Sequence, residues 1–138
     1  MRASSSPPAF LDTNVLVYAL GDDRARTPVA EALLERGGVI SVQVLNELAA
    51  VAHRKLGMSW DDVTEVVEVM RTLCPSPRPI TWALHTQALA LAARDGYHIY
   101  DALIVAAALD AGCTTLYSED MQDGRVIDDR LTIRNPFT

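Results

Sequence analysis

The run of residues 99–111 constrains the fold more than any other segment, because it is apolar on almost every side. Tyr100, Asp101 and Asp110 are the only interruptions in a series of alanine, leucine, isoleucine and valine. A helix with no polar face must be covered by other elements all around it, so this run predicts a helix buried in the middle of the protein. It is too short to cross a bilayer, and Gly112 is expected to end it.

Short apolar runs separated by helical segments predict a layered α/β fold. The expected strands are residues 9–11, 39–40, 114–117 and 131–134, with a short edge strand near Ile80. Between them, apolar residues recur at helical spacing, and the helices start at polar caps. These caps are Thr27, Ser41, Ser59 and Thr81. Alternating strands and helices indicate a three-layer sandwich with a mostly parallel central sheet flanked by helices.

The 138 residues correspond to one domain, without repeats or a Gly/Ser-rich linker. Residues 1–8 are expected to form a flexible N-terminal tail, and residues 9–138 a single domain. No apolar segment precedes the first strand, so a signal peptide is not expected. Cys74 and Cys113 share no metal-binding spacing with each other or with the three histidines, which predicts reduced cysteines in a cytoplasmic protein.

Four carboxylates fall at the ends of the predicted elements. Asp12 ends the first strand, and Asp120 follows the strand at residues 114–117. Asp101 lies in the first turn of the buried helix, and Glu47 borders the core within the helix that Ser41 caps. Each acid has an ordinary role when taken alone. Asp12 and Asp101 are typical helix-capping residues, Asp120 is a typical turn residue, and Glu47 suits a solvated helix face.

Taken together, the four acids indicate a metal site. Ligands of parallel α/β folds bind outside the carboxyl ends of the strands, where these acids are expected to meet. Several carboxylates cannot stay ionised together in a low-dielectric cleft without a cation. Ligands that are all oxygen select a hard divalent ion, Mg²⁺ or Mn²⁺, which can hold a phosphate and activate a bound water.

The segments around these acids resemble the four motifs of the PIN-domain ribonucleases, in particular the VapC-type toxins of type II toxin–antitoxin pairs. The first motif is FLDTNVLVY at residues 10–18, and the second is SVQVLNE at residues 41–47. The third is YDALIVAAA at residues 100–108, and the fourth is LYSEDMQDG at residues 116–124. The resemblance covers residues 10–134, and it implies a single PIN-like sandwich.

The resemblance further implies a Mg²⁺-dependent endoribonuclease that leaves a 5′ phosphate and a 3′ hydroxyl. Asp12, Asp101 and Asp120 would hold one or two Mg²⁺ ions, with Mn²⁺ as a substitute. Glu47 would complete this catalytic set or orient the attacking water. The fourth motif leaves the choice of the last acid open.

The candidates for the last acid of the fourth motif are Asp120, Asp123 and Glu119. Asn14, Ser118 and Asp123 are auxiliary candidates around the metal ligands.

The partners that the resemblance implies are an RNA substrate, a cognate antitoxin protein and a second copy of the chain, with no membrane. The apolar face of the helix after Ser59 could serve the homodimer or belong to the core. Five cations are candidates for contacts with the RNA backbone, although each suits an ordinary surface charge equally well. These are Arg24, Arg26, Arg54, Lys55 and Arg125.

Two alternatives remain beside the ribonuclease. One is a PIN-like binding scaffold without catalysis, although all four acidic positions are filled. The other is a phosphoaspartate-type phosphotransfer domain with Asp12 as the nucleophile. Such domains need a lysine near the phosphoryl group, and Lys55 is the only lysine in the chain. Asn14 also stands where the related phosphatases carry a second aspartate.

The net charge of −6 argues against a broad basic surface for nucleic acid. Four of the 18 acidic residues are the proposed site acids, so the remaining acids are nearly balanced by the 12 basic residues. Bound Mg²⁺ would neutralise the site itself. The charge therefore predicts a protein that reaches its phosphate through metal, with a few arginines assisting.

Overall fold

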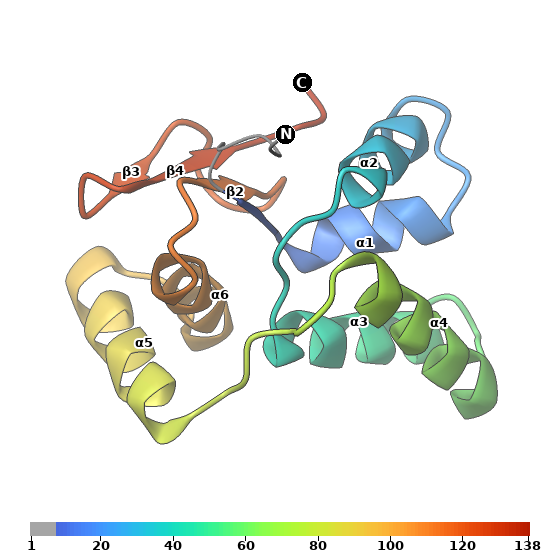
Figure 1. The fold of residues 1–138 in the computed structure, drawn as a ribbon, viewed down its shortest axis with the longest axis horizontal. Coiled ribbons are helices and arrows are strands. Elements are labelled where there is room, and N and C mark those ends of the chain that lie inside the picture. The colour runs from blue at the N-terminus through green and yellow to red at the C-terminus, as the bar shows by residue number, and fades with distance from the viewer. Residues whose placement is uncertain (1–7) are drawn as a thin grey trace, which may run out of the picture.

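The computed structural model describes residues 8–138, so the tail prediction for residues 1–7 lies outside the described part of the chain. Four strands form the central sheet in the order β1-β2-β4-β3 (Figure 1). They are β1 (Ala9–Leu11), β2 (Thr115–Tyr117), β3 (Val126–Ile127) and β4 (Leu131–Arg134). β1, β2 and β4 are parallel, and only β3 is antiparallel to its neighbour. The predicted mostly parallel sheet is confirmed.

Six helices accompany the sheet within residues 8–138. They are α1 (Thr13–Leu20), α2 (Arg26–Glu35), α3 (Val42–Arg54), α4 (Trp60–Leu73), α5 (Trp82–Asp95) and α6 (Ile99–Asp110). In Figure 1, α5 and α6 lie side by side on one flank, while α1, α2, α3 and α4 gather on the other. Helices therefore flank the sheet as the alternating sequence pattern predicts.

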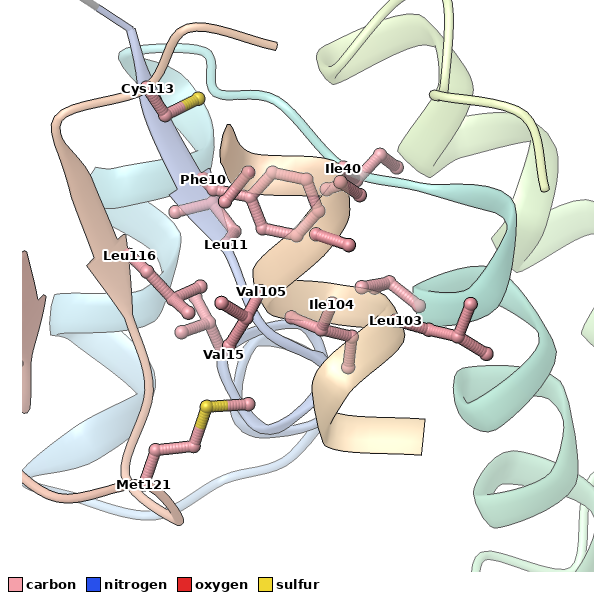
Figure 2. Packing of buried hydrophobic residues seen from close by; sticks show 14 of the residues in the cluster. Phe10, Leu11, Val15, Ile40, Leu103, Ile104, Val105, Cys113, Leu116 and Met121 are labelled. Atoms are coloured by element: carbon pink, nitrogen blue, oxygen red, sulfur yellow. The ribbon is translucent and has the colours of Figure 1, made fainter. Parts of the chain in front are cut away.

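The body of α6 is the centre of the hydrophobic core. Every residue from 102 to 109 is buried, which confirms the prediction of a helix covered on all sides. Figure 2 shows Ile104 and Val105 among side chains of the sheet and of α1. Burying a side chain of this size stabilises a fold by roughly 1.5–3 kcal/mol, so α6 is the main support of the surrounding elements.

Local capping signals are confirmed at five helix ends. The side chains of Ser41, Ser59 and Thr81 each accept a hydrogen bond from a backbone N–H in the first turn of their helix. Gly96 ends α5 at a φ of 77°, a left-handed conformation that glycine adopts without strain. Gly112 follows α6 with a φ of 74°.

Three local predictions were wrong. Thr27 does not cap α2, which begins at Arg26 without a side-chain cap. The Thr27 hydroxyl donates instead to the carbonyl of Tyr18 at 2.7 Å. Residues 39–40 do not form a strand, because the chain enters α3 directly after a single bridge between Val39 and Phe10. The expected edge strand near Ile80 is likewise reduced to one bridge, between residues 41 and 78.

Strand β3 was not predicted. Its two residues lie in a largely polar segment and acquire a strand conformation only by pairing with β4.

Cys74 and Cys113 are both free and buried. No helix in residues 8–138 is long and apolar enough to cross a membrane.

Candidate active site

Asp12 follows β1 directly and is the centre of the candidate site. Only 3% of its surface is exposed. Its Oδ1 accepts a hydrogen bond from the N–H of Thr13 at 2.7 Å, which caps α1. Its Oδ2 accepts from the Ser118 hydroxyl at 2.7 Å and from the Asn14 amide at 3.3 Å. Helix capping and a role in the site are therefore compatible, because each uses a different carboxylate oxygen.

The environment of Asp12 opposes its ionisation. Its pKa is raised from 3.8 to about 7, mainly by burial and in smaller part by the negative charges of Glu47 and Asp101. Hydrogen bonds from Ser118 and Thr13 lower the pKa and offset part of this increase. The three hydrogen-bond donors to Asp12 are neutral, so its charge has no direct cationic partner among residues 8–138.

Ser118 and Asn14 connect Asp12 to the turn after β2. Ser118 is fully buried, and its hydroxyl oxygen accepts from the backbone N–H groups of Asp120 and Met121 while donating to Asp12. The Nδ2 of Asn14 donates to Asp12 and, at 3.2 Å, to Asp120 Oδ2. Two of the three predicted auxiliary residues, Asn14 and Ser118, thus lie beside Asp12 and hold carboxylates in place.

Glu47 reaches the site from α3, and both of its carboxylate oxygens accept hydrogen bonds. Thr13 Oγ1 donates to Oε1 at 3.0 Å, and Gln43 Nε2 donates to Oε2 at 2.9 Å. These two donors were not predicted from the sequence. The available signals were the position of Thr13 next to Asp12 and the spacing of Gln43 four residues before Glu47 on one helix face.

As predicted, Asp101 lies in the first turn of α6, where it is half-buried. Burial raises its pKa above the ordinary value, and the charges of Glu47 and Asp120 raise it further, while His98 lowers it. The pKa of Asp12 responds to Glu47 and Asp101 in the same way. The four predicted acids therefore share one electrostatic environment, although they come from distant parts of the chain.

The three candidates for the last acid differ in what holds them. Glu119 accepts from the Tyr18 hydroxyl and from Arg26, on the side of α1 and α2. Asp123 accepts from the backbone N–H of Asn135 at 2.8 Å. Only Asp120 shares a hydrogen-bond donor with Asp12, the amide of Asn14. This geometry favours Asp120.

The residues fit a hard divalent cation by chemistry and charge. The oxygen atoms near Asp12 that could act as ligands belong to carboxylates and to the Ser118 hydroxyl, and the buried carboxylate lacks a cationic partner within residues 8–138. No group of three or more His, Cys, Asp or Glu side chains within residues 8–138 is arranged to hold a metal ion. Instead, the predicted acids are held by hydrogen bonds within the chain. Thr13 and Gln43 hold Glu47, and the Asn14 amide bridges Asp12 and Asp120.

The candidate RNA-contacting cations fall into two groups. Arg26 is paired with Asp23 and Glu119, and Arg125 lies over the ring of Tyr97 at 4.9 Å, beside Asp95. The others are exposed and form no ion pair with any acid in the described part of the chain. They are Arg24, Arg54 and Lys55.

Comparisons with known proteins agree on the fold. A family model described as the PIN domain matches residues 9–125. The structure is similar to VapC20 of Mycobacterium tuberculosis, described as a Sarcin-Ricin loop cleaving toxin, with a TM-score of 0.68 and 21% identity over 81% of this chain and 89% of that one. It is also similar to VapBC2 of Rickettsia felis, crystallised with a DNA fragment from its promoter, with a TM-score of 0.65 and 20% identity over 92% and 97% of the two chains. No curated protein matches the chain.

Proposed function

The chain belongs to the PIN domain family, and from that premise we propose that it is a Mg²⁺-dependent endoribonuclease, the toxin of a type II toxin–antitoxin pair acting in the cytoplasm. The observation that carries the proposal is Asp12, a carboxylate only 3% exposed and held by neutral donors. Burial and two neighbouring acids oppose its charge, so its ionised form needs a cation.

In this proposal Asp12, Asp101 and Asp120 hold the metal. Nucleases of this family use a divalent ion, and the oxygen donors favour Mg²⁺ or Mn²⁺. When bound, the ion supplies activation of a water and neutralisation of charge on the phosphate. Ser118 and the N–H of Thr13 favour the ionised form of Asp12, which is the form that binds metal.

Glu47 has a separate role, that of orienting the water that attacks phosphorus. Thr13 and Gln43 fix its carboxylate through one oxygen each, which leaves a second lone pair on each oxygen to accept from the water. Cleavage is expected to leave a 5′ phosphate and a 3′ hydroxyl. We also propose that the domain extends over residues 9–138, beyond the family match, because β4 pairs with both β2 and β3.

The proposed partners are an RNA substrate, a cognate antitoxin and a second copy of the chain. VapC20 is described as a Sarcin-Ricin loop cleaving toxin, and VapBC2 was crystallised with a DNA fragment from its promoter, which supports the RNA substrate and the antitoxin partner. An apolar groove between α1, α2 and α4 supports contact with another protein. Its two cavities, about 300 and 270 Å³, share Leu20, Val69 and Met70 in their lining.

The test is RNA cleavage by the purified chain with and without Mg²⁺ or Mn²⁺, with the ends of the products mapped. Asp101→Asn should abolish cleavage, whereas Asp110→Asn, at the exposed far end of the same helix, should leave it intact. Circular dichroism establishes that both variants fold. Full cleavage by Asp12→Asn and by Asp101→Asn would overturn the proposal, and metal binding without any cleavage would favour the scaffold alternative.

A further inference from the structure

Glu119 lies next to the proposed site, but the hydrogen bonds of its carboxylate are directed to α1 and α2 instead of Asp12. Tyr18 Oη donates to Oε2 at 2.7 Å, and Arg26 Nε donates to Oε1 at 3.0 Å. Tyr18 belongs to α1 and Arg26 begins α2, so two helices hold this one side chain. Arg26 also pairs with Asp23 at 3.4 Å, which further fixes the guanidinium.

The backbone of Glu119 contacts the site through Asn14. Its N–H donates to Asn14 Oδ1 at 3.1 Å. The Asn14 oxygen is therefore occupied, and the amide nitrogen is turned toward Asp12 and Asp120, 3.3 and 3.2 Å away. Asn14 and Tyr18 are four residues apart on α1, so both hydrogen bonds attach the turn at residues 118–120 to one face of that helix.

We propose that Glu119 is a positioning residue of the nuclease site. Its side chain anchors the turn to α1 and α2, so that its N–H orients the Asn14 amide and Asp120 stays next to Asp12. This inference rests on the proposed function. Glu119 acts through Asn14 and Asp120, and it touches neither metal nor RNA.

Electrostatics explain why the turn needs this anchor. Asp120 is exposed, and the charges of the neighbouring acids repel it from the site. The charge-assisted contact with Arg26 holds the turn in place from outside the acidic cluster. It also neutralises Glu119, which would otherwise add another negative charge.

The contact between Glu119 and Arg26 is expected to affect metal binding more than folding stability. Ion pairs with this degree of exposure contribute little to folding stability. Residues that orient metal ligands typically change metal affinity about 10–100-fold when they are replaced. Loss of the anchor should therefore weaken metal binding much more than it weakens the fold.

The experiment measures Mn²⁺ binding by titration calorimetry, together with RNA cleavage, in the full chain. Glu119→Ala is expected to bind Mn²⁺ about tenfold more weakly and to lower kcat with KM within about twofold. Tyr18→Phe should act in the same direction by a smaller factor, and the double variant should match Glu119→Ala alone. Glu68→Ala is the matched control, because it breaks the surface pair with Arg71 on α4, at 2.9 Å.

Unchanged Mn²⁺ affinity and kcat in Glu119→Ala would overturn the positioning role, and so would tighter binding. If Glu119→Ala does not fold, Tyr18→Phe decides by the same two measurements. A wild-type chain that binds Mn²⁺ but leaves RNA intact would overturn the proposed function, while the affinities still decide the role of Glu119. A wild-type chain that binds no Mn²⁺ overturns both.

Discussion

Burial stabilises the body of α6, but it destabilises the charged carboxylates near the first turn of that helix. Residues 102–109 are apolar and buried, so each of them stabilises the fold. Asp12 and Asp101 are buried or half-buried acids with raised pKa values, so their charged forms destabilise it. The two regions are adjacent, because Asp101 belongs to the same helix as the core residues. The core therefore supports a site that would not assemble by itself, and changes in the two regions should have opposite effects on stability.

The largest expected effect is on activity, from Asp12→Asn. Asparagine still caps α1, but it cannot supply the carboxylate charge that a cation needs. Cleavage should fall at least about 10³-fold, as expected when several kcal/mol of transition-state stabilisation are lost. The metal-free variant should be at least as stable as the wild type at pH 8, measured by guanidinium unfolding with a chelator present. A clear loss of stability in Asp12→Asn would show that the charge of Asp12 does not destabilise the metal-free fold.

The second prediction concerns the pH dependence of stability without metal. The folded-state pKa of Asp12 is about 7 and its ordinary value is 3.8, so between these values the native state holds a proton that the unfolded chain has lost. The stability that this protonation contributes is present at low pH and is lost as the pH rises through about 7. The free energy of unfolding should therefore fall on this account by on the order of 4 kcal/mol between about pH 4 and pH 8.

Asp12→Asn is the control for this measurement, because it removes the titrating group. Its free energy of unfolding should change less with pH than that of the wild type. Saturating Mn²⁺ should flatten the wild-type curve, because the ion binds the ionised carboxylate. Identical slopes in the wild type and the variant would show that Asp12 does not carry this pH dependence.

The third prediction probes the core side of the comparison. Ile104→Ala should lower the free energy of unfolding by about 2–5 kcal/mol, because Ile104 is fully buried in the centre of α6. Leu89→Ala is the matched control in the neighbouring helix α5, where the side chain is 49% exposed, and should cost less than about 1 kcal/mol. Below its melting temperature Ile104→Ala should keep its metal affinity. A lower affinity in the folded variant would mean that core and site are coupled.

The smallest effect is expected from Gln43→Ala, which frees one oxygen of Glu47. The kcat should fall about tenfold, while the free energy of unfolding changes by no more than about 1 kcal/mol. Gln87→Ala is a suitable control, because it makes the same substitution at a half-buried glutamine of another helix, α5. An equal loss of activity in both variants would argue against a specific role for Gln43.

Sequence reasoning succeeded where the signal was local. The apolar run of α6, the caps at Ser41, Ser59 and Thr81, and the strand pattern each depend on residues close together in the chain. It failed where pairing decided the outcome. Residues 39–40 have strand composition but too short a contact with β1, and β3 is a strand only through its pairing with β4.

The same distinction between local signals and long-range contacts applies to the candidate site. Asp12, Asp101 and Asp120 stood out because each lies at the end of an element, and Glu47 because it borders the core within α3, but the side chains that hold them could not be predicted. The direction of the Asn14 amide depends on a backbone N–H more than a hundred residues away, and the carboxylate of Glu119 is turned by Arg26 from a separate helix. Nothing in the local sequence indicates these contacts, since they arise only when the sheet brings the ends of β1 and β2 together.

The hydrogen bond from Ser118 to Asp12 spans 106 residues, which has a consequence for the order of synthesis. The ribosome makes Asp12 before β2 and the turn at residues 118–120. A partly translated chain therefore lacks the sheet partner that fixes the end of β1, as well as one proposed ligand. If the chain acts on RNA as proposed, a nascent protein that has not yet reached this turn stays inert.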